Sequence, residues 1–184
     1  MKTSIMSNLK SLFEDNLAQL RTNIERGFPN TRARQHRANM VNVTKTEFIP
    51  YPQQYALLIR AAVRGEDGTY NSRMLFRDVD YQDADNPNVV TFKAVNNEEY
   101  HIVPVFRDLH DVELGCTCLD YAWRFWMQNY QKDVQFGQGP SPYRRKTPPP
   151  PQGRPYANPM EVTGMCKHLI ALSQSLEKTG ILKT

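Results

Sequence analysis

The chain has 184 residues, a formal net charge of +4 and 40% apolar residues. It contains no run of about 18 apolar residues, which excludes a hydrophobic membrane-spanning helix, and its length fits one domain with appendages. Its three cysteines are an odd number, so a secreted disulfide framework is not expected and a reducing compartment is favoured. The mild positive charge permits contact with nucleic acid or with an acidic protein surface, but requires neither.

Residues 1–45 are predicted to form an N-terminal helix followed by a basic arm. Apolar residues recur at helical spacing across residues 4–27, and Gly27 is a typical residue at a helix end. Charged residues interrupt the apolar pattern near the start, so no signal peptide is predicted. The helix can pack on the chain's own core or dock on a partner. Three arginines of the arm are candidate contacts to phosphates or to an acidic neighbour, unless the arm is only a solvated linker: Arg32, Arg34 and Arg37.

From residue 46 to residue 115 the hydrophobic pattern has a period of two, which predicts an antiparallel β-meander of four or five strands. The stretches "QYALLIRAAVR" and "TYNSRMLFRDV" flank "GEDG", and "NVVTFKAV" and "EYHIVPVF" flank Asn96-Asn97, so two hairpins are expected. Pro104 indicates a bulge or an edge position in its strand. "DVELG" is predicted to be a further short strand that leads into Cys116.

The second half of the chain combines two predicted helices with a proline-rich insert. The first helix is "LDYAWRFWMQNYQK", with a predicted apolar face that comprises Leu119, Ala122, Trp123, Trp126 and Tyr130. Residues 133–163 are rich in proline and are expected to be extended, without a core of their own. The insert carries three more candidate contacts to phosphates or partners, namely Arg144, Arg145 and Lys146. "MCKHLIALSQSLEKTG" predicts the last helix, and residues 46–184 are predicted to form a single domain.

All three cysteines occur in two short motifs, Cys116-x-Cys118 and Cys166-x-His168. Three thiolates and one imidazole are a complete tetrahedral ligand set for Zn²⁺. Side chains two residues apart in an extended strand point to the same side, so Cys116 and Cys118 can bind one ion. Cys166 is expected at the entry to the last helix and His168 in its first turn, where the helix N-terminus favours a thiolate.

Other interpretations of this pattern remain open at the level of sequence. The cysteines can be ordinary buried residues, the group can hold a [4Fe–4S] cluster, and His110 is a substitute fourth ligand. The 47 residues between the two motifs do not exclude a shared ion. Each doubling of a flexible loop costs only about 0.6 kcal/mol, whereas a structural zinc ion contributes on the order of 10 kcal/mol.

The four residues, with a strand before the first motif and "CKHL" opening the last helix, resemble the SWIM-type zinc finger across about residues 98–178. "CTCLDYAWRF" is similar to the C-x-C-P-D-F/Y form of that family, with Leu119 where a proline is usual. The resemblance implies an α+β fold in which zinc, held by Cys116, Cys118, Cys166 and His168, fastens a C-terminal ββα or αα finger. The order of meander, first motif, proline-rich insert and second motif also looks like small structural proteins of tailed bacterial viruses.

A closed Cys₃His set leaves no open position for metal-assisted catalysis, and neither a phosphate-binding glycine loop nor a nucleophile elbow is present. The chain is therefore expected to be a non-enzymatic zinc-binding assembly protein that contacts other protein subunits. A virion or the cytoplasm of a host cell is the expected location, without contact to a membrane. The alternative is a SWIM-type nucleic-acid-binding protein.

Overall fold

A four-stranded antiparallel sheet forms the centre of the computed structural model, which describes residues 16–28, 40–139 and 157–184. The strands are β1 (Asn42–Tyr51), β2 (Ala56–Gly65), β3 (Gly68–Phe76) and β7 (Val112–Cys116), in the order β1-β2-β3-β7. The "GEDG" hairpin is confirmed, because β2 and β3 pair up to Gly65 and Gly68. Strand β1 was not recognised as a separate strand in the sequence, and a short 3₁₀ turn, η3 (Pro52–Gln54), links it to β2.

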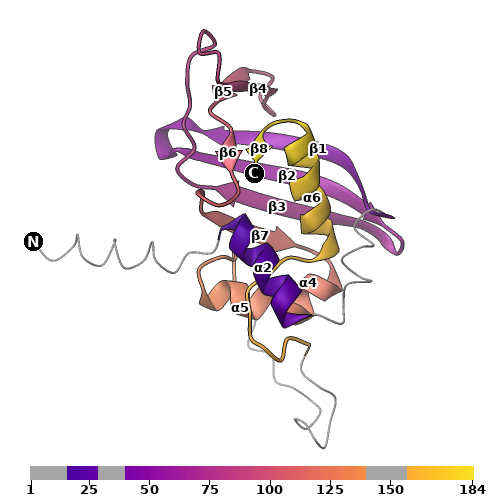
Figure 1. The fold of residues 1–184 in the computed structure, drawn as a ribbon. Coiled ribbons are helices and arrows are strands. Elements are labelled where there is room, and N and C mark those ends of the chain that lie inside the picture. The colour runs from indigo at the N-terminus through magenta and orange to yellow at the C-terminus, as the bar shows by residue number, and fades with distance from the viewer. Residues whose placement is uncertain (1–15, 29–39, 140–156) are drawn as a thin grey trace, which may run out of the picture.

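One face of this sheet carries the core, as the alternation along β2 shows. Leu57, Ile59 and Val63 are buried, whereas Arg60 and Arg64 on the opposite face are exposed. Helix α6 (Lys167–Lys178) packs across the apolar face and contacts all four strands (Figure 1). The predicted last helix is thus confirmed. It is followed by Gly180, whose φ of 78° is a backbone conformation that glycine adopts without strain.

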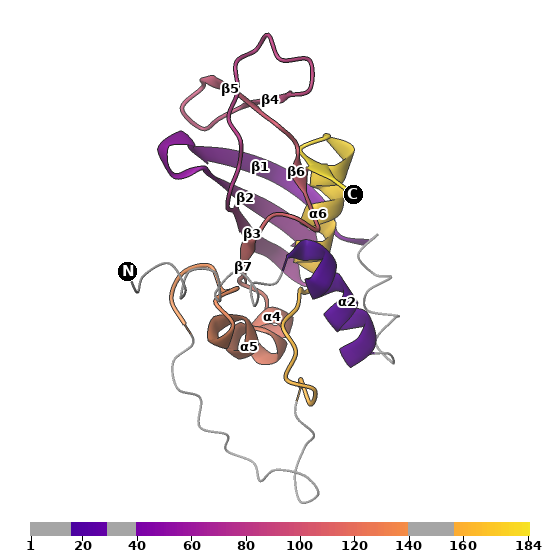
Figure 2. The same cartoon turned by 60° about the vertical axis from the view of Figure 1, so that its left-hand side comes forward.

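The prediction of one continuous meander is wrong for the second hairpin. Strands β4 (Val90–Lys93) and β5 (Glu99–Ile102) pair with each other in a separate two-stranded ribbon, to which Tyr81 adds an isolated bridge at Ile102. Pro104 ends this run, because it separates β5 from the short strand β6 (Val105–Phe106). Strand β6 instead pairs in parallel with β8 (Leu182–Lys183), so the C-terminus joins the fold beside α6. Figure 2 shows the β4–β5 ribbon at one end of the molecule and the helical residues 119–131 toward the other.

The described part of the N-terminal helix packs on the chain's own core. Helix α2 (Leu17–Gly27) begins after Asn16, whose side chain accepts a hydrogen bond from the backbone N–H of Gln19 at 2.9 Å. Its buried stripe is made of Leu17, Leu20 and Ile24. The remainder of the predicted helix, residues 4–15, lies outside the described residues. No helix in the described parts of the chain is long and apolar enough to span a bilayer.

The helix predicted after the first cysteine motif is confirmed, but it is divided into two short helices, and two residues of its predicted apolar face are exposed. It consists of α4 (Leu119–Arg124) and α5 (Trp126–Gln131), which meet at Phe125. Leu119 is 72% exposed and Trp123 58%, whereas Tyr121, Phe125 and Asn129 are buried. The segment is apolar almost all round, so hydrophobicity alone does not identify its inner face. The inner face includes Asn129, whose polar side chain can be buried because its hydrogen bonds are satisfied.

The described ends of the predicted insert pack on the domain. Leu114 of β7 exchanges backbone hydrogen bonds of 2.7 and 2.8 Å with Val134 and Phe136, which places residues 134–136 beside the sheet edge. At the other end, Asn158 and Thr163 are buried between α2 and α4. The middle of the insert, residues 140–156, lies outside the described residues.

Candidate metal centre

The fold brings the two cysteine motifs together from opposite ends of the insert. Cys116 is the last residue of β7, Cys118 is the N-cap of α4, Cys166 is the N-cap of α6, and His168 lies in the first turn of α6. One ligand atom from each of these side chains lies within 4.8 Å of all the others. Cys118, Cys166 and His168 are buried, and Cys116 is partly buried. The structure therefore places all four predicted residues in one group that could hold a metal ion.

The distances within the group fit a single tetrahedral ion. His168 Nδ1 lies 3.9 Å from the Sγ atoms of Cys116 and Cys166. With zinc–sulfur bonds of about 2.3 Å and zinc–nitrogen bonds of about 2.0 Å, a tetrahedral site places sulfur and nitrogen about 3.5 Å apart. The observed separations are slightly larger, so a modest contraction would close the four atoms around an ion. Three thiolates are also the donors that a soft or borderline cation such as Zn²⁺ prefers.

The first motif is fixed by hydrogen bonds to the neighbouring strand. Thr117 N donates to the backbone oxygen of Asn71 at 3.1 Å, and Asn71 N donates to Thr117 Oγ1 at 3.0 Å. The Ser72 hydroxyl lies 3.6 Å from Cys116 Sγ and donates to it. The backbone N–H of Tyr121 donates to Cys118 Sγ at 3.3 Å, within the first turn of α4. Two of the sulfurs thus receive hydrogen bonds that stabilise a thiolate.

The second motif is held in place by a buried asparagine. The Asn129 side chain donates to Gly164 O at 3.0 Å and accepts from Gly164 N at 2.9 Å, and it also donates to Tyr121 Oη at 3.1 Å. Tyr121 Oη in turn contacts Leu114 O at 2.8 Å and Gln135 Oε1 at 2.6 Å. This network, called here the Asn129 clasp, connects β7, α4, α5 and the chain just before Cys166. It therefore sets the position from which the second motif enters the site.

A second asparagine closes the loop that precedes Gly164. Asn158 Nδ2 donates to Arg124 O at 2.9 Å and to Val162 O at 2.7 Å, and Val162 N donates back to Asn158 Oδ1 at 3.2 Å. Gly164 itself passes close to α4, since a Cβ there would lie 2.6 Å from Phe125 Cε1. The approach to Cys166 is thus tightly packed, and a side chain at this position would require the Phe125 ring to move.

His168 is oriented by an aromatic ring and by a glycine. The centroid of the Tyr70 ring lies 4.4 Å from that of the imidazole, with 36° between the planes. A Cβ at Gly65 would lie 3.0 Å from His168 Nε2, so the β2–β3 turn closely approaches this nitrogen. His168 Nε2 is buried and has no hydrogen-bond partner within the part of the chain that the structure describes. The ring therefore presents Nδ1 to the sulfurs and Nε2 to the turn.

The surroundings shift the pKa values of Cys116 and Cys166 in opposite directions. Hydrogen bonds from the Cys118 thiol, then from Cys166 and Ser72, lower the pKa of Cys116 to about 3 against the opposing effect of burial. Burial is the main cause that raises the pKa of Cys166 well above its usual value of 9.0. Burial also raises the pKa of Tyr121, which keeps its hydroxyl neutral in the Asn129 clasp. Without a metal, Cys116 thus favours the thiolate and Cys166 the thiol, and a bound cation would favour ionisation of Cys166 as well.

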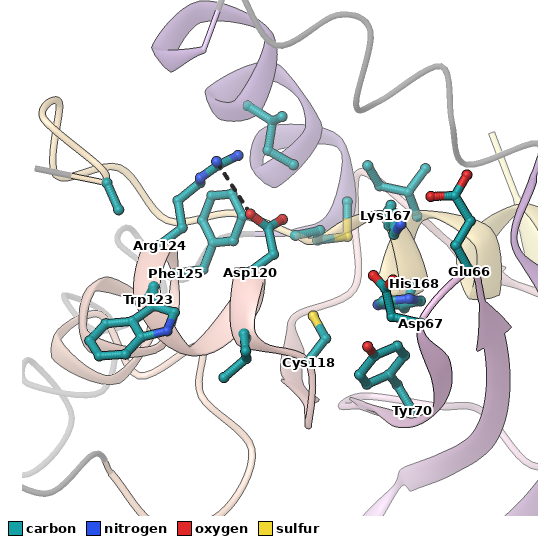
Figure 3. A pocket seen from close by; sticks show the side chains of 15 residues that line it. Glu66, Asp67, Tyr70, Cys118, Asp120, Trp123, Arg124, Phe125, Lys167 and His168 are labelled. Atoms are coloured by element: carbon teal, nitrogen blue, oxygen red, sulfur yellow. Dashed lines mark ion pairs between the residues drawn. The ribbon is translucent and has the colours of Figure 1, made fainter.

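An open groove of about 690 Å³ lies beside the centre, between α4 and the β2–β3 turn (Figure 3). Its lining includes Cys118, His168 and Tyr70. On the far wall, Arg124 pairs with Asp120 at 3.2 Å and lies 5.0 Å above the Phe28 ring. The groove gives the metal group one accessible side.

The other predicted candidates do not join the group. His110 Nδ1 contacts the backbone N and O of Phe106 at 3.1 and 3.2 Å, so it is held away from the cysteines. His101 contacts Thr91 on the neighbouring strand. The six basic candidates lie outside the described residues: Arg32, Arg34, Arg37, Arg144, Arg145 and Lys146.

Sequence analysis missed the residues that support the ligands, namely Gly65, Ser72, Tyr121, Asn129, Asn158 and Gly164. Two of them lie in patterns quoted above, Tyr121 in the C-x-C-P-D-F/Y form and Gly65 in "GEDG". Neither pattern indicates that Tyr121 Oη contacts Asn129 or that Gly65 approaches His168. Among the others, the one available signal was the glycine that shortly precedes Cys166. Comparison with known proteins adds no further assignment, since no family model, curated protein or solved structure matches the chain.

Proposed function

We propose that this chain is a non-enzymatic zinc protein of the SWIM type, in which the ion fastens the C-terminal half of the fold. The observation that carries this proposal is the Cys₃His group itself, formed by Cys116, Cys118, Cys166 and His168 within 4.8 Å. Four protein ligands complete a tetrahedral zinc site and leave no position for a substrate or an activated water. A structural role for the ion follows from that closed set.

Zinc is favoured over an iron–sulfur cluster by the size of the site. A [4Fe–4S] cluster inserts a cube of four irons and four sulfides between its protein ligands. Ligand atoms that lie within 4.8 Å of one another leave room for one ion, but not for that cube. Among single ions, the mixture of thiolates and one imidazole favours Zn²⁺.

The proposed function is assembly through contacts with other proteins. Several large apolar side chains project from α4 and α5, where Leu119 is 72% exposed, Tyr130 51% and Met127 38%. Exposed large apolar side chains are enriched on surfaces that meet another protein. A place in the virion of a tailed bacterial virus is the most specific form of this proposal, and it is supported by the resemblance in sequence.

Site-specific photo-crosslinking tests the assembly role in the cells in which the chain is naturally made. A photoreactive phenylalanine analogue at position 119 is expected to give a discrete protein adduct. The matched control carries the analogue at Glu98, on the distant β4–β5 ribbon, and should give none. An equal distribution of adducts at both positions, or none at either, would contradict the assembly role while leaving the zinc site untouched.

Nucleic-acid binding is the second candidate, and the sheet face opposite α6 is the observation that favours it. Arg60 and Arg73 lie directly opposite each other on neighbouring strands of that face, and both are exposed. Arg60 is, however, paired with Glu47 at 3.2 Å, and Glu47 also pairs with Lys45. Binding of duplex or single-stranded DNA should weaken steeply as salt rises if this function is correct. Absence of binding at low salt would remove it.

A further inference from the structure

The unpartnered ring nitrogen of His168 is the least explained polar atom of the metal group. His168 is 2% exposed, and its Nε2 has no hydrogen-bond partner among the described residues. Its Nδ1 lies 3.9 Å from two cysteine sulfurs and is therefore the nitrogen placed to bind the ion. In a neutral imidazole bound through Nδ1, the proton is on Nε2. Metal binding thus creates a buried N–H donor that requires an acceptor.

The β2–β3 turn is the part of the chain that reaches this nitrogen. Gly65 begins the turn and approaches Nε2 so closely that a Cβ would lie 3.0 Å away. The two central residues of the turn are Glu66 and Asp67, which line the same groove as His168. Both are exposed, and neither forms an ion pair with another described residue. The turn therefore brings two carboxylates, neither in an ion pair with another described residue, to the groove that His168 lines.

The directions of the two side chains distinguish them. Figure 3 shows Asp67 beside the imidazole of His168, whereas Glu66 extends away from the ring on the side of Lys167. Asp67 is on an exposed turn, so rotation of its side chain alone can change the position of its carboxylate. Tyr70 stacks on the ring face, which leaves the ring edge at Nε2 to the turn.

We propose that Asp67 is a positioning residue that accepts a hydrogen bond from His168 Nε2–H and so orients the imidazole toward the metal. This inference rests on the proposed zinc function and extends it to a residue outside the four ligands. Histidine ligands commonly donate their second N–H to a carboxylate, which fixes the tautomer and makes the ligating nitrogen more basic. The carboxylate of Asp67 would do this for Nδ1 of His168.

The decisive experiment compares Asp67→Asn with Glu66→Gln in the full chain. Both variants remove one negative charge from the same turn, but only the first changes the proposed acceptor. Zinc affinity, measured by competition with a chromophoric chelator, should fall about 10–100-fold in Asp67→Asn and by less than about threefold in Glu66→Gln. Asp67→Glu retains the carboxylate and should recover part of the loss.

An NMR readout separates positioning from a general effect on folding. In the zinc-loaded protein with ¹⁵N-labelled histidine, His168 should show a slowly exchanging Nε2 proton, and this proton should exchange faster in Asp67→Asn. Unchanged affinity and unchanged proton exchange in Asp67→Asn would overturn the proposal. Equal losses in Asp67→Asn and Glu66→Gln would also overturn it, since the turn would then act through its charge alone. If the wild-type chain binds no zinc, the proposed function fails as well, so the two failures are distinguishable.

Discussion

The two halves of the metal centre are held in the fold by different means. The first half, Cys116 and Cys118, is at the end of a sheet strand and is fixed by backbone and side-chain hydrogen bonds to Asn71 and Ser72. The second half, Cys166 and His168, follows the insert, and its approach depends on the Asn129 clasp and on Asn158.

This difference indicates which half needs the ion. Residues paired in a sheet keep their places as long as the sheet is folded, so the first half is largely preformed. The second half depends on a few side-chain hydrogen bonds across a long chain separation. A metal ion that binds both halves therefore mainly stabilises the segment from residue 157 to the start of α6.

Loss of the ion should lower the stability of the protein more than any other change, and it should destabilise the second half more than the first. Cys166→Ser removes one of three thiolates, so zinc should no longer be retained. The melting temperature is expected to fall by about 10 °C or more, because a structural zinc site contributes several kcal/mol or more. Hydrogen exchange should accelerate at residues 158–170 far more than in β2 and β3. Equal acceleration in both regions would contradict the distinction between the halves.

Removal of the Asn129 clasp should weaken the second half directly. Asn129→Ala leaves the backbone N–H and C=O of Gly164 without partners and also removes a contact to Tyr121 Oη. The free energy of unfolding should drop by about 3 kcal/mol, as measured by denaturant titration of the zinc-loaded protein. The matched control is Asn96→Ala in the exposed β4–β5 turn, with a change within about 0.5 kcal/mol. Similar losses in both variants would show that the clasp has no special role.

Two glycine-to-alanine substitutions, one in each half, test the same comparison with a smaller expected effect on stability. Gly164→Ala would place a Cβ 2.6 Å from Phe125 Cε1 in the second half, and overpacking of this kind costs about 1–3 kcal/mol. Gly115→Ala in the first half meets its nearest atom at 3.6 Å, an ordinary contact. Its expected effect is therefore close to zero. Thermal unfolding of the two variants side by side checks this, and a larger loss in Gly115→Ala would refute it.

The smallest expected effect concerns the thiolate of the first half. Ser72→Ala removes one of the hydrogen bonds that lower the pKa of Cys116, so that pKa should rise in the metal-free protein. The pKa of Cys116 is lower in the folded state than in the unfolded state. Its stabilising contribution is therefore complete above about pH 9 and is lost as the pH falls toward 3. The ultraviolet absorbance of the thiolate should disappear at a higher pH in the variant, with a stability cost of about 1 kcal/mol. Superimposable titration curves would exclude a role for Ser72.

The four members of the metal group could be predicted from sequence because short-range chemistry determines them. The Cys-x-Cys pair at a strand end points both side chains to one side of the strand. The Cys-x-His pair at a helix start supplies the other two donors of a tetrahedral zinc site. The β2–β3 hairpin and α6 could be predicted for a similar reason, since "GEDG" and the apolar stripe of the last helix are local signals.

The parts that were missed depend on contacts between distant segments. Asn129 is polar, and nothing near it in the sequence indicates that Gly164, 35 residues later, will satisfy its side chain. The sequence predicted that Leu119 and Trp123 lie on one apolar face, but it could not show that both are exposed and that Asn129 is buried instead. The β4–β5 ribbon has the same alternating pattern as the sheet strands, so the pattern could not show that it forms a sheet separate from the four-stranded one.

The most direct test of the central claim is metal analysis of the full chain purified without added metal, combined with cobalt substitution. The expected result is one zinc ion per chain in wild-type protein and none in Cys118→Ser. Cobalt(II) at the same site should give the visible absorption of tetrahedral thiolate coordination. Protein that retains no metal, or that contains iron and sulfide in stoichiometric amounts, would contradict the zinc centre on which the proposed function depends.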